Sequence, residues 1–294
     1  MKNKKAIILL ITIMSLFIFA LVGLMIFVIN NKFNIKFRGI FTQRIEELQI
    51  EEIYKNNYEK ININTDSADV YIKQSEDEDI HVKVYSEKEK SRVIDNEIEL
   101  NIEVEQKKCV GICINNKVSK VELYIPKDYE KAIKIDNKYG DIEIASFEKL
   151  NLEIKEDAGD IKIGSSNIVN INNNYGDIEI GTIKEGTIKE AAGDIKINKV
   201  NSIDIKNNFG DTKITEVNEY LKIDADAGDI KINILNITKD SFIETNAGDV
   251  RIEKANDIYV DAETDVGSAK VNNNNRNAEI TLKIENNVGD IKVN

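Results

Sequence analysis

The stretch IKIDNKYGDIEI, residues 133–144, contains the pattern that decides the fold of this chain. On both sides of its Gly-Asp pair, isoleucine alternates with charged or polar residues, which is the pattern of a half-buried β-strand. Ile133 and Ile135 share one parity, whereas Ile142 and Ile144 share the other. The Gly-Asp pair must therefore form a corner or bulge that resets the alternation, and glycine supplies the backbone freedom for it.

This stretch recurs along the chain, for example as IKNNFGDTKI from Ile205 and LKIDADAGDIKI from Leu221. Successive glycines of the repeat lie 17 to 22 residues apart, which leaves room for two or three short strands and none for an ordinary helix. Repeats of this length predict a solenoid. We expect an all-β, single-stranded parallel β-solenoid, right-handed because parallel crossovers favour that hand. The predicted corners are Gly140, Gly159, Gly176, Gly193, Gly210, Gly228, Gly248, Gly267 and Gly289.

The residue before the glycine alternates between large and small in the first copies: Tyr139, Ala158, Tyr175, Ala192 and Phe209. It has the parity of the isoleucines before it, which predicts that it points into the core. An alanine beneath each ring would then leave the ring enough space in a packed interior. The alternative is an outward column of rings that binds a ligand.

An aspartate follows the glycine in nearly every copy, so the carboxylates should stack about 4.8 Å apart at the corner. Stabilisation of the turn backbone is the expected role. A calcium ladder is the alternative, although one Gly-Asp pair per coil matches calcium-binding nonapeptide repeats poorly. If the column points outward, lysines such as Lys162, Lys196 and Lys231 would offset it and face Glu143 and Glu179 of neighbouring coils.

Residues 6–29, AIILLITIMSLFIFALVGLMIFVI, contain no charge and are long enough to cross a bilayer as a helix. They exceed the apolar core of a signal peptide, and no small-residue cleavage site follows them. We predict an uncleaved, single-pass anchor in the cell membrane, with the lipid bilayer as a partner. Basic residues flank the span on both sides, but the short tail of residues 1–5 favours a cytoplasmic N-terminus and an extracytoplasmic C-terminal domain.

Residues 30–60 are expected to form a partly helical connector. Their apolar residues recur near helical spacing, which suits a helix on the membrane surface or one that caps the next domain. The apolar positions are Phe33, Phe37, Phe41, Ile45 and Leu48.

Residues 61–130 are expected to form an irregular β cap before the Gly-Asp solenoid of residues 131–294. The segment ININTDSADVYI within this cap resembles a repeat with Ala68 in place of glycine. At the other end of the chain, GDIKVN stops in mid-strand at Asn294, which predicts an open edge or a very short terminal strand.

Composition excludes several functions. The net charge of −12 argues against nucleic acid as a partner, and one histidine with two cysteines cannot build a Cys/His zinc cluster. No catalytic motif, metal site or cofactor site is predicted, and His81 is expected to face solvent. Cys109 and Cys113 flank Gly111, where a hairpin could bring them together as a disulfide outside the cell; inside, they would remain thiols.

The arrangement resembles a bacterial family of membrane-linked β-strand-repeat proteins, known as candidate adhesins or domain of unknown function 4097. The residues that carry the resemblance are VELYIPKDYEKAIKIDNKYGDIEI, 121–144, and the AGDIKI copies at 158, 192 and 227. The resemblance covers residues 61–294 and implies a role in the cell envelope. It implies no reaction, ligand or catalytic residue.

The expected function is a non-catalytic surface binding module, adhesin-like, that contacts envelope polymers or other envelope proteins. The alternative is a membrane-tethered scaffold that assembles end to end through the open edge at Gly289–Asn294. A carbohydrate-cleaving enzyme is a third and weaker hypothesis, because no coil departs from the repeat to gather carboxylates in one groove.

Overall fold

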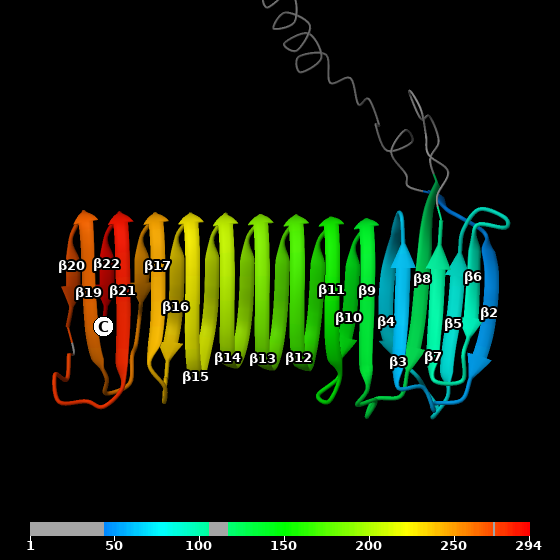
Figure 1. Ribbon diagram of the computed structural model, residues 1–294, viewed down its shortest axis with the longest axis horizontal. Helices are drawn as coiled ribbons and strands as arrows, with labels where there is room; N and C mark the ends of the chain where they lie inside the picture. Colours follow the sequence, from blue (N-terminus) through cyan, green and yellow to red (C-terminus); the bar gives the residue numbers. More distant parts are fainter. Residues whose placement is uncertain (1–43, 106–116, 273) are drawn as a thin grey trace, which may run out of the picture. The chain divides into compact units, whose positions relative to one another are not determined.

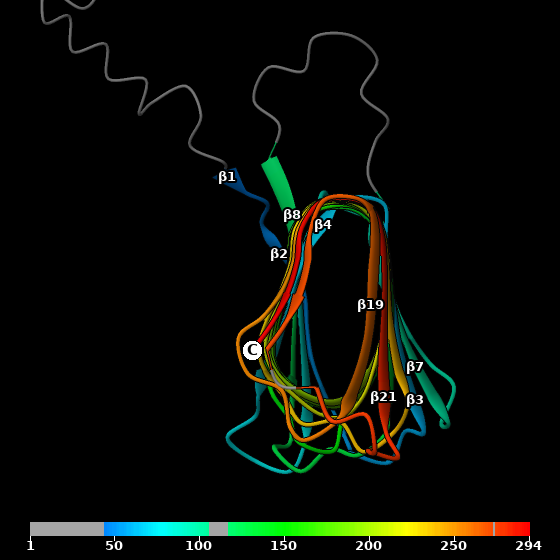
Figure 2. The ribbon, with the colours of Figure 1, turned by 90° about the vertical axis from the view of Figure 1, so that its left-hand side faces the viewer.

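The computed structural model describes residues 44–105, 117–272 and 274–294, which form an all-β parallel solenoid. Figure 1 shows the strands stacked side by side along one axis, and Figure 2 looks down that axis onto flattened coils. Each coil runs along one wall, turns at the Gly-Asp corner and returns along the opposite wall. We call these walls the pre-corner face and the post-corner face.

Four long strands pass from the post-corner face of one coil to the pre-corner face of the next: β12 (Ile161–Tyr175), β13 (Ile178–Ala192), β14 (Ile195–Phe209) and β15 (Thr212–Ala227). The pre-corner face also contains β3 (Lys60–Thr65), β6 (Ser91–Asp95), β7 (Glu99–Val104), β9 (Ala132–Tyr139), β11 (Asn151–Ala158), β17 (Ser241–Ala247), β19 (Tyr259–Val266) and β21 (Thr281–Val288). The post-corner face also contains β1 (Arg44–Ile45), β2 (Leu48–Tyr54), β4 (Ala68–Gln74), β5 (Ile80–Tyr85), β8 (Lys117–Ile125), β10 (Ile142–Ser146), β16 (Ile230–Leu235), β18 (Val250–Ile252), β20 (Ala269–Val271) and β22 (Ile291–Val293).

The interior consists of apolar columns in strict register. Ile142 pairs with Ile161, which pairs with Ile178 and then Ile195, and all four side chains are buried. Each buried isoleucine contributes about 1.5–3 kcal/mol of transfer free energy. The same register extends to the segment that carries Ala68, because Val70 pairs with Ile142. The predicted equivalence of Ala68 to a corner glycine is therefore confirmed.

Both ends of the solenoid depart from chain order. At the N-terminal end, β3 and β4 pair with β9 and β10, whereas β7 and β8 lie outside them. At the C-terminal end, β21 lies between β17 and β19, and β22 lies between β18 and β20 (Figure 1). Of the two expectations for Gly289–Asn294, the very short terminal strand is confirmed, because β22 has three residues. The open edge is wrong, since this last strand is paired on both sides. The edge belongs to β19 and β20.

Antiparallel strands close the N-terminal end. On the post-corner face β5 pairs antiparallel with β8 and with β2, and on the pre-corner face β6 pairs antiparallel with β7. The described part of the expected partly helical connector, residues 44–60, contains the strands β1 and β2 and no helix. β1 pairs with β8 and β2 pairs with β5. The residues expected to form an irregular cap also include four strands that follow the register of the solenoid: β3 and β4, with β7 and β8 paired in parallel beside them.

Several expectations fall on residues that the structure does not describe. These are the membrane span at residues 6–29, the tail before it, the connector up to residue 43, and the pair Cys109 and Cys113. Within the described ranges, no helix is long and apolar enough to cross a membrane.

Candidate functional site: the Gly-Asp corner

The corner glycines stack so closely that a side chain has no room. A Cβ on Gly159 would lie 2.0 Å from the carbonyl oxygen of Gly140, and one on Gly193 would lie 2.0 Å from that of Gly176. Most of these glycines also have positive φ, for example 130° at Gly176. The structure thus places all nine predicted glycines at one corner, where two coils contact each other through backbone alone.

The aspartates after these glycines form a continuous ladder on the outside of the corner. Asp160 N–H donates to Asp141 Oδ1 at 3.0 Å, and Asp177 N–H donates to Asp160 Oδ1 at 3.0 Å. The ladder begins at Asp69 and ends where Ser268 N–H donates to Asp290 Oδ1. Each carboxylate therefore satisfies the backbone of the next coil, rather than that of its own turn as the sequence suggested. No three acidic, histidine or cysteine side chains gather at a metal-binding distance within the described ranges.

A column of mostly polar side chains lies on the inside of the same corner, three residues before each glycine; we call it the inner column. Asn137 Nδ2 donates to the carbonyl oxygens of Ala68 and Gly140, at 3.1 and 3.2 Å. These contacts fix the carbonyl groups where the chain turns. In spatial order the inner column is Thr65, Asn137, Glu156, Asn173, Glu190, Asn207, Ala225, Thr245, Asn286 and Thr264.

Two members of the inner column are glutamates in an otherwise uncharged interior. Glu156 is fully buried and Glu190 is 2% exposed. Burial raises the pKa of Glu156 to about 7, and the hydrogen bond from Ala158 N–H offsets this only in part. Burial also raises the pKa of Glu190, whose Oε1 accepts a hydrogen bond from Ala192 N–H at 2.9 Å.

The rings before the glycines point outward, contrary to the prediction. Tyr139 is 59% exposed, Tyr175 is 64% exposed and Phe209 is 60% exposed. The alternation breaks before the glycine: Asn137 is the last inward residue of β9, and the next two residues are both exposed. The inner column fills the corner, so the ring must turn to solvent. We call Tyr139, Tyr175 and Phe209 the ring row.

Alanines separate the members of the ring row along the axis. Ala158 lies in register with Tyr139, and Ala192 lies in register with both Tyr175 and Phe209. Rings therefore recur at every second coil, about 9.6 Å apart. The exposed aspartate ladder runs beside them, two residues further along each coil.

Charged side chains on the post-corner face alternate over the same coils. Glu143, Lys162, Glu179 and Lys196 follow one another in register. Lys196 Nζ lies 2.6 Å from Glu179 Oε1, which confirms the predicted contact between neighbouring coils. The pair is exposed and stabilises the fold by no more than about 1 kcal/mol.

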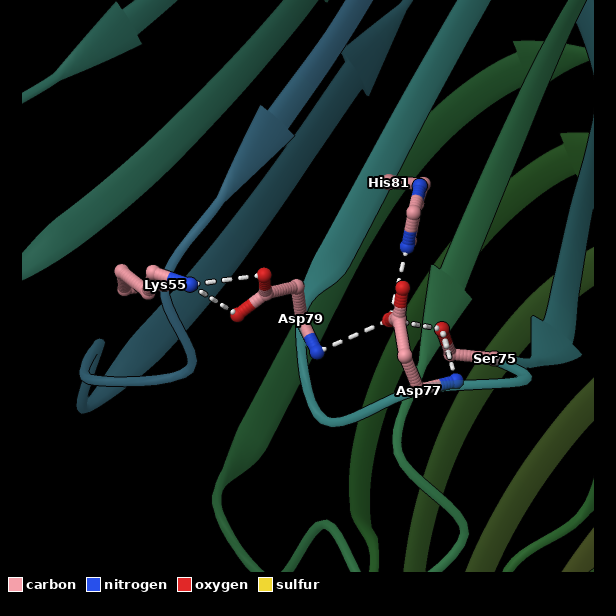
Figure 3. A network of polar contacts seen from close by, with 5 residues as sticks. All are labelled: Lys55, Ser75, Asp77, Asp79 and His81. Carbon is pink, nitrogen blue, oxygen red and sulfur yellow. Dashed lines mark hydrogen bonds and ion pairs between the residues drawn. The ribbon is translucent and has the colours of Figure 1, made fainter.

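A second polar cluster lies at the N-terminal end, around His81, the second residue of β5 (Figure 3). His81 Nε2 lies 2.8 Å from Asp77 Oδ1, and Ser75 Oγ donates to the same oxygen at 2.9 Å. These contacts lower the pKa of Asp77 to about 2, with the histidine contact as the largest cause. Lys55 holds Asp79 through both carboxylate oxygens.

This cluster does not have the arrangement of a nucleophile and its base. The carboxylate of Asp77 lies between the hydroxyl and the imidazole, whereas an activated serine contacts the imidazole directly. The cluster orders the loop before β5, since Asp77 also accepts a hydrogen bond from Asp79 N–H. His81 is half-buried, so it is less open to solvent than the sequence suggested.

Comparison with known proteins now identifies the class. The model of the Toastrack DUF4097 family matches residues 58–294, and the chain belongs to this family. No curated protein matches the chain.

Three solved structures that match the chain share little sequence with it. A candidate cell adhesion protein from Clostridium sporogenes is 16% identical, with a TM-score of 0.32, and the match covers 84% of this chain and 99% of the other chain. A candidate adhesin from Bacteroides fragilis is 17% identical, with a TM-score of 0.46, and covers 84% and 97%. A candidate lipid-binding protein from Parabacteroides distasonis is 14% identical, with a TM-score of 0.47, and covers 85% and 98%.

Sequence reasoning missed the inner column, although a signal was present. The residue three before the glycine reads Asn, Glu, Asn, Glu, Asn over the first five Gly-Asp copies, in phase with the large and small residues before the glycine. The asparagine copies carry the rings and the glutamate copies carry alanine. The repeating unit of this region is therefore two coils.

Proposed function

We propose that this chain is a non-catalytic binding module of the cell envelope, anchored through residues 6–29, that holds an extended glycan along its ring row. The observation that carries the proposal is the outward ring row itself. Three aromatic side chains, each more than half exposed, recur at every second coil of a rigid scaffold. Exposed rings in a regular row are costly to display unless they contact a partner.

The spacing of the ring row suits a polymer with a matching repeat. The rings stand about 9.6 Å apart. Two sugar rings of an extended β-1,4-linked chain span nearly the same length, so every second sugar could stack on a ring. The aspartate ladder beside the row uses Oδ1 for backbone contacts, and its exposed carboxylates can accept hydrogen bonds from sugar hydroxyl groups.

Rigidity supports affinity for such a ligand. The backbone under the ring row is fixed by the aspartate ladder outside and by the inner column inside. A pre-ordered surface loses little conformational entropy on binding, because tyrosine and phenylalanine have few rotatable bonds.

A pull-down with insoluble glycans tests the proposal. The full-length chain, purified in a mild detergent, should sediment with chitin and with bacterial cell-wall glycan, and should not bind amylose, whose α-linked chain coils. The variant Y139A/Y175A/F209A should lose at least about tenfold in affinity, since each ring contact is worth on the order of 1 kcal/mol.

The matched control removes exposed apolar side chains elsewhere. Ile53 is 64% exposed and Ile98 is 63% exposed, both at the N-terminal end and away from the ring row. The variant I53A/I98A should bind as the wild type does. Equal binding by the triple variant, or equal binding to amylose, would refute the proposal.

The membrane side is tested by thiol labelling. A membrane-impermeant reagent applied to intact cells should label Cys109 or Cys113, directly or after reduction. Labelling that appears only after the cells are broken open would place the binding module in the cytoplasm and contradict an envelope role.

End-to-end assembly receives no support from the termini. The strand expected to be open, β22, is paired on both sides. The true edge is partly blocked, because the side chain of Asn274 accepts a hydrogen bond from Val260 N–H at 2.9 Å and donates to its carbonyl at 2.8 Å. Such blocking is a common protection against edge pairing.

A further inference from the structure

The inner column contains buried side-chain oxygen atoms, on neighbouring coils, that have no hydrogen-bond partner. Glu156 Oε2 and Asn173 Oδ1 are both buried and have no hydrogen-bond partner. These residues lie in register on neighbouring coils. Glu190 Oε2 and Asn207 Oδ1 repeat the situation two coils further on. A buried acceptor without a donor is costly, and a native interior rarely leaves one so.

The N-terminal end of the inner column shows one way in which the asparagine oxygen is satisfied. Thr65 lies in register with Asn137, and its hydroxyl donates a hydrogen bond to Asn137 Oδ1. The amide of Asn137 is turned so that its nitrogen serves the carbonyls of the corner. Asn173 and Asn207 have the same orientation, because their nitrogens donate to Gly176 O and Gly210 O. Their oxygens therefore need a donor from the preceding coil, where a glutamate stands instead of a threonine.

We propose that Glu156 and Glu190 are held as neutral carboxylic acids in the folded protein, each donating its proton to the asparagine oxygen of the next coil. One carboxyl oxygen accepts the backbone N–H two residues on, and the other carries the proton. The proton comes from solvent during folding, and no bond other than O–H is made. With it, all four orphan oxygens become satisfied.

The charged surroundings favour the neutral form. On its own strand and the neighbouring coils, the groups nearest to Glu156 are Asp157 and Asp141, both negative, and the amide of Asn137. For Glu190, the nearby acid Asp177 raises the pKa further, whereas contact with the side-chain amide of Asn173 lowers it. No lysine or arginine is among these neighbours, and the post-corner face opposite presents isoleucines. The backbone N–H groups and the side-chain amides of Asn137 and Asn173 lower the two pKa values, but burial outweighs them, and no cation is among these neighbours.

The corner itself differs where the glutamates stand. The glycines of the flanking asparagine coils, Gly140, Gly176 and Gly210, have positive φ, whereas Gly159 and Gly193 do not. A positive φ also occurs at Gly228 and Gly248, which follow alanine as Gly159 and Gly193 do. The conformation thus follows the glutamate, whose carboxyl group accepts the N–H before the glycine, and does not follow the alanine.

The consequence is a pH-dependent fold that is independent of any ligand. Raising the pH must remove both protons or unfold the corner that holds them, so stability falls as pH rises through neutrality. The test compares the full-length chain with E156Q/E190Q, in which each glutamine amide donates to the same asparagine oxygen at every pH. The urea midpoint of the wild type should fall between about pH 5 and about pH 8, and the variant should lose more than half of that slope.

Two further measurements decide between this proposal and a merely structural role. The infrared band of a protonated carboxylic acid should be present in the wild type at neutral pH and absent in E156Q/E190Q. The control E153Q/E179Q changes exposed glutamates of the same strands, β11 and β13, and should keep both the band and the slope. Parallel pH profiles for wild type and E156Q/E190Q, or no such band, would overturn the proposal.

Discussion

The middle of the solenoid and its C-terminal end share one scaffold and differ in what it carries. Both have the stacked glycines, the aspartate ladder and the isoleucine columns. Only the middle, from β9 to β14, alternates asparagine with glutamate inside and rings with alanine outside. In the C-terminal end, from β15 to β22, the inner column becomes alanine, threonine and asparagine, and the rings are replaced by alanine and valine.

This difference separates what builds the fold from what is added to it. The C-terminal end stacks its coils without a glutamate in the inner column and without a ring before the glycine. The buried acids and the exposed rings are therefore not demanded by the architecture. Features that cost stability and are not required by the fold are candidates for function.

Substitution of a corner glycine should have the largest effect on stability, and it should be similar in both regions. The substitution Gly193→Ala in the middle places a Cβ 2.0 Å from a backbone oxygen, and Gly248→Ala at the C-terminal end places one 2.1 Å from another. Because backbone cannot move aside, each should lower the free energy of unfolding by on the order of 3–5 kcal/mol. Urea unfolding of the full-length chain measures this.

Gly186 offers a matched control within the middle. A Cβ there would meet only the terminal methyl groups of Ile203 and Ile183, which can rotate away. Gly186→Ala should therefore cost much less than Gly193→Ala. Equal losses would show that the corner contact is not what makes glycine necessary.

The next effect belongs to the inner column of the middle. Asn207→Ala removes the donor to Gly210 O and Gly193 O and leaves those carbonyls without this partner. We expect a loss of about 1–3 kcal/mol. The neighbouring coil has Ala225 at this position. Ala225→Asn should therefore raise the free energy of unfolding by part of that amount. The control is Asn208→Ala, because Asn208 is half-exposed. If Asn207→Ala lowers the free energy of unfolding no more than Asn208→Ala does, the amide of Asn207 does not stabilise the corner.

The pH effect should be confined to the middle. The folded pKa of Glu156 is about 7 against an ordinary value of 4.5, so the folded state binds a proton that the unfolded state has lost between these values. Its stabilising contribution is complete below about pH 4.5 and is lost as pH rises through about 7, at most about 3 kcal/mol. Hydrogen exchange, corrected for its intrinsic pH dependence, should quicken in β11–β14 and not in β17–β22. Uniform quickening would contradict this assignment.

The glycine period predicted the solenoid because every coil must pass the same backbone contact, and Ala68 was recognisable by the strand pattern around it. The order of the end coils was not predictable from that pattern. The strands β17, β19 and β21 all alternate inward and outward residues in the same way, so hydrophobic pattern alone cannot choose among them. The changed order shows in the sequence separation of ladder contacts at the two ends. Asp141 N–H donates to Asp69 Oδ1 across 72 residues, and Asp290 N–H donates to Asp249 Oδ1 across 41.

The inward prediction for the rings failed for a local reason. Strict alternation was extended to the glycine, although the strand ends its inward sequence at Asn137, and the next residues turn with the corner. A polar residue at an inward position was the available sign, because a buried amide or acid needs backbone partners, and only a turn offers them. Asn137, Glu156 and Asn173 each mark the place where alternation stops.

The smallest expected effect comes from a substitution that extends the charge alternation of the middle into the C-terminal end. On the post-corner face, glutamate and lysine alternate up to Lys196, but Lys213, Lys231 and Arg251 then follow in register as like charges. Lys213→Glu would place one negative charge between the two positive charges of Lys196 and Lys231. It should raise the free energy of unfolding by roughly 0.2–1 kcal/mol. The gain should shrink in high salt, because these side chains are exposed. Lys206→Glu, on the pre-corner face, is the control, since Lys206 already lies 3.8 Å from Asp224 and should lose stability instead. A gain for both variants would mean that lowering the number of lysines, and not the alternation of charge between coils, is what stabilises the end.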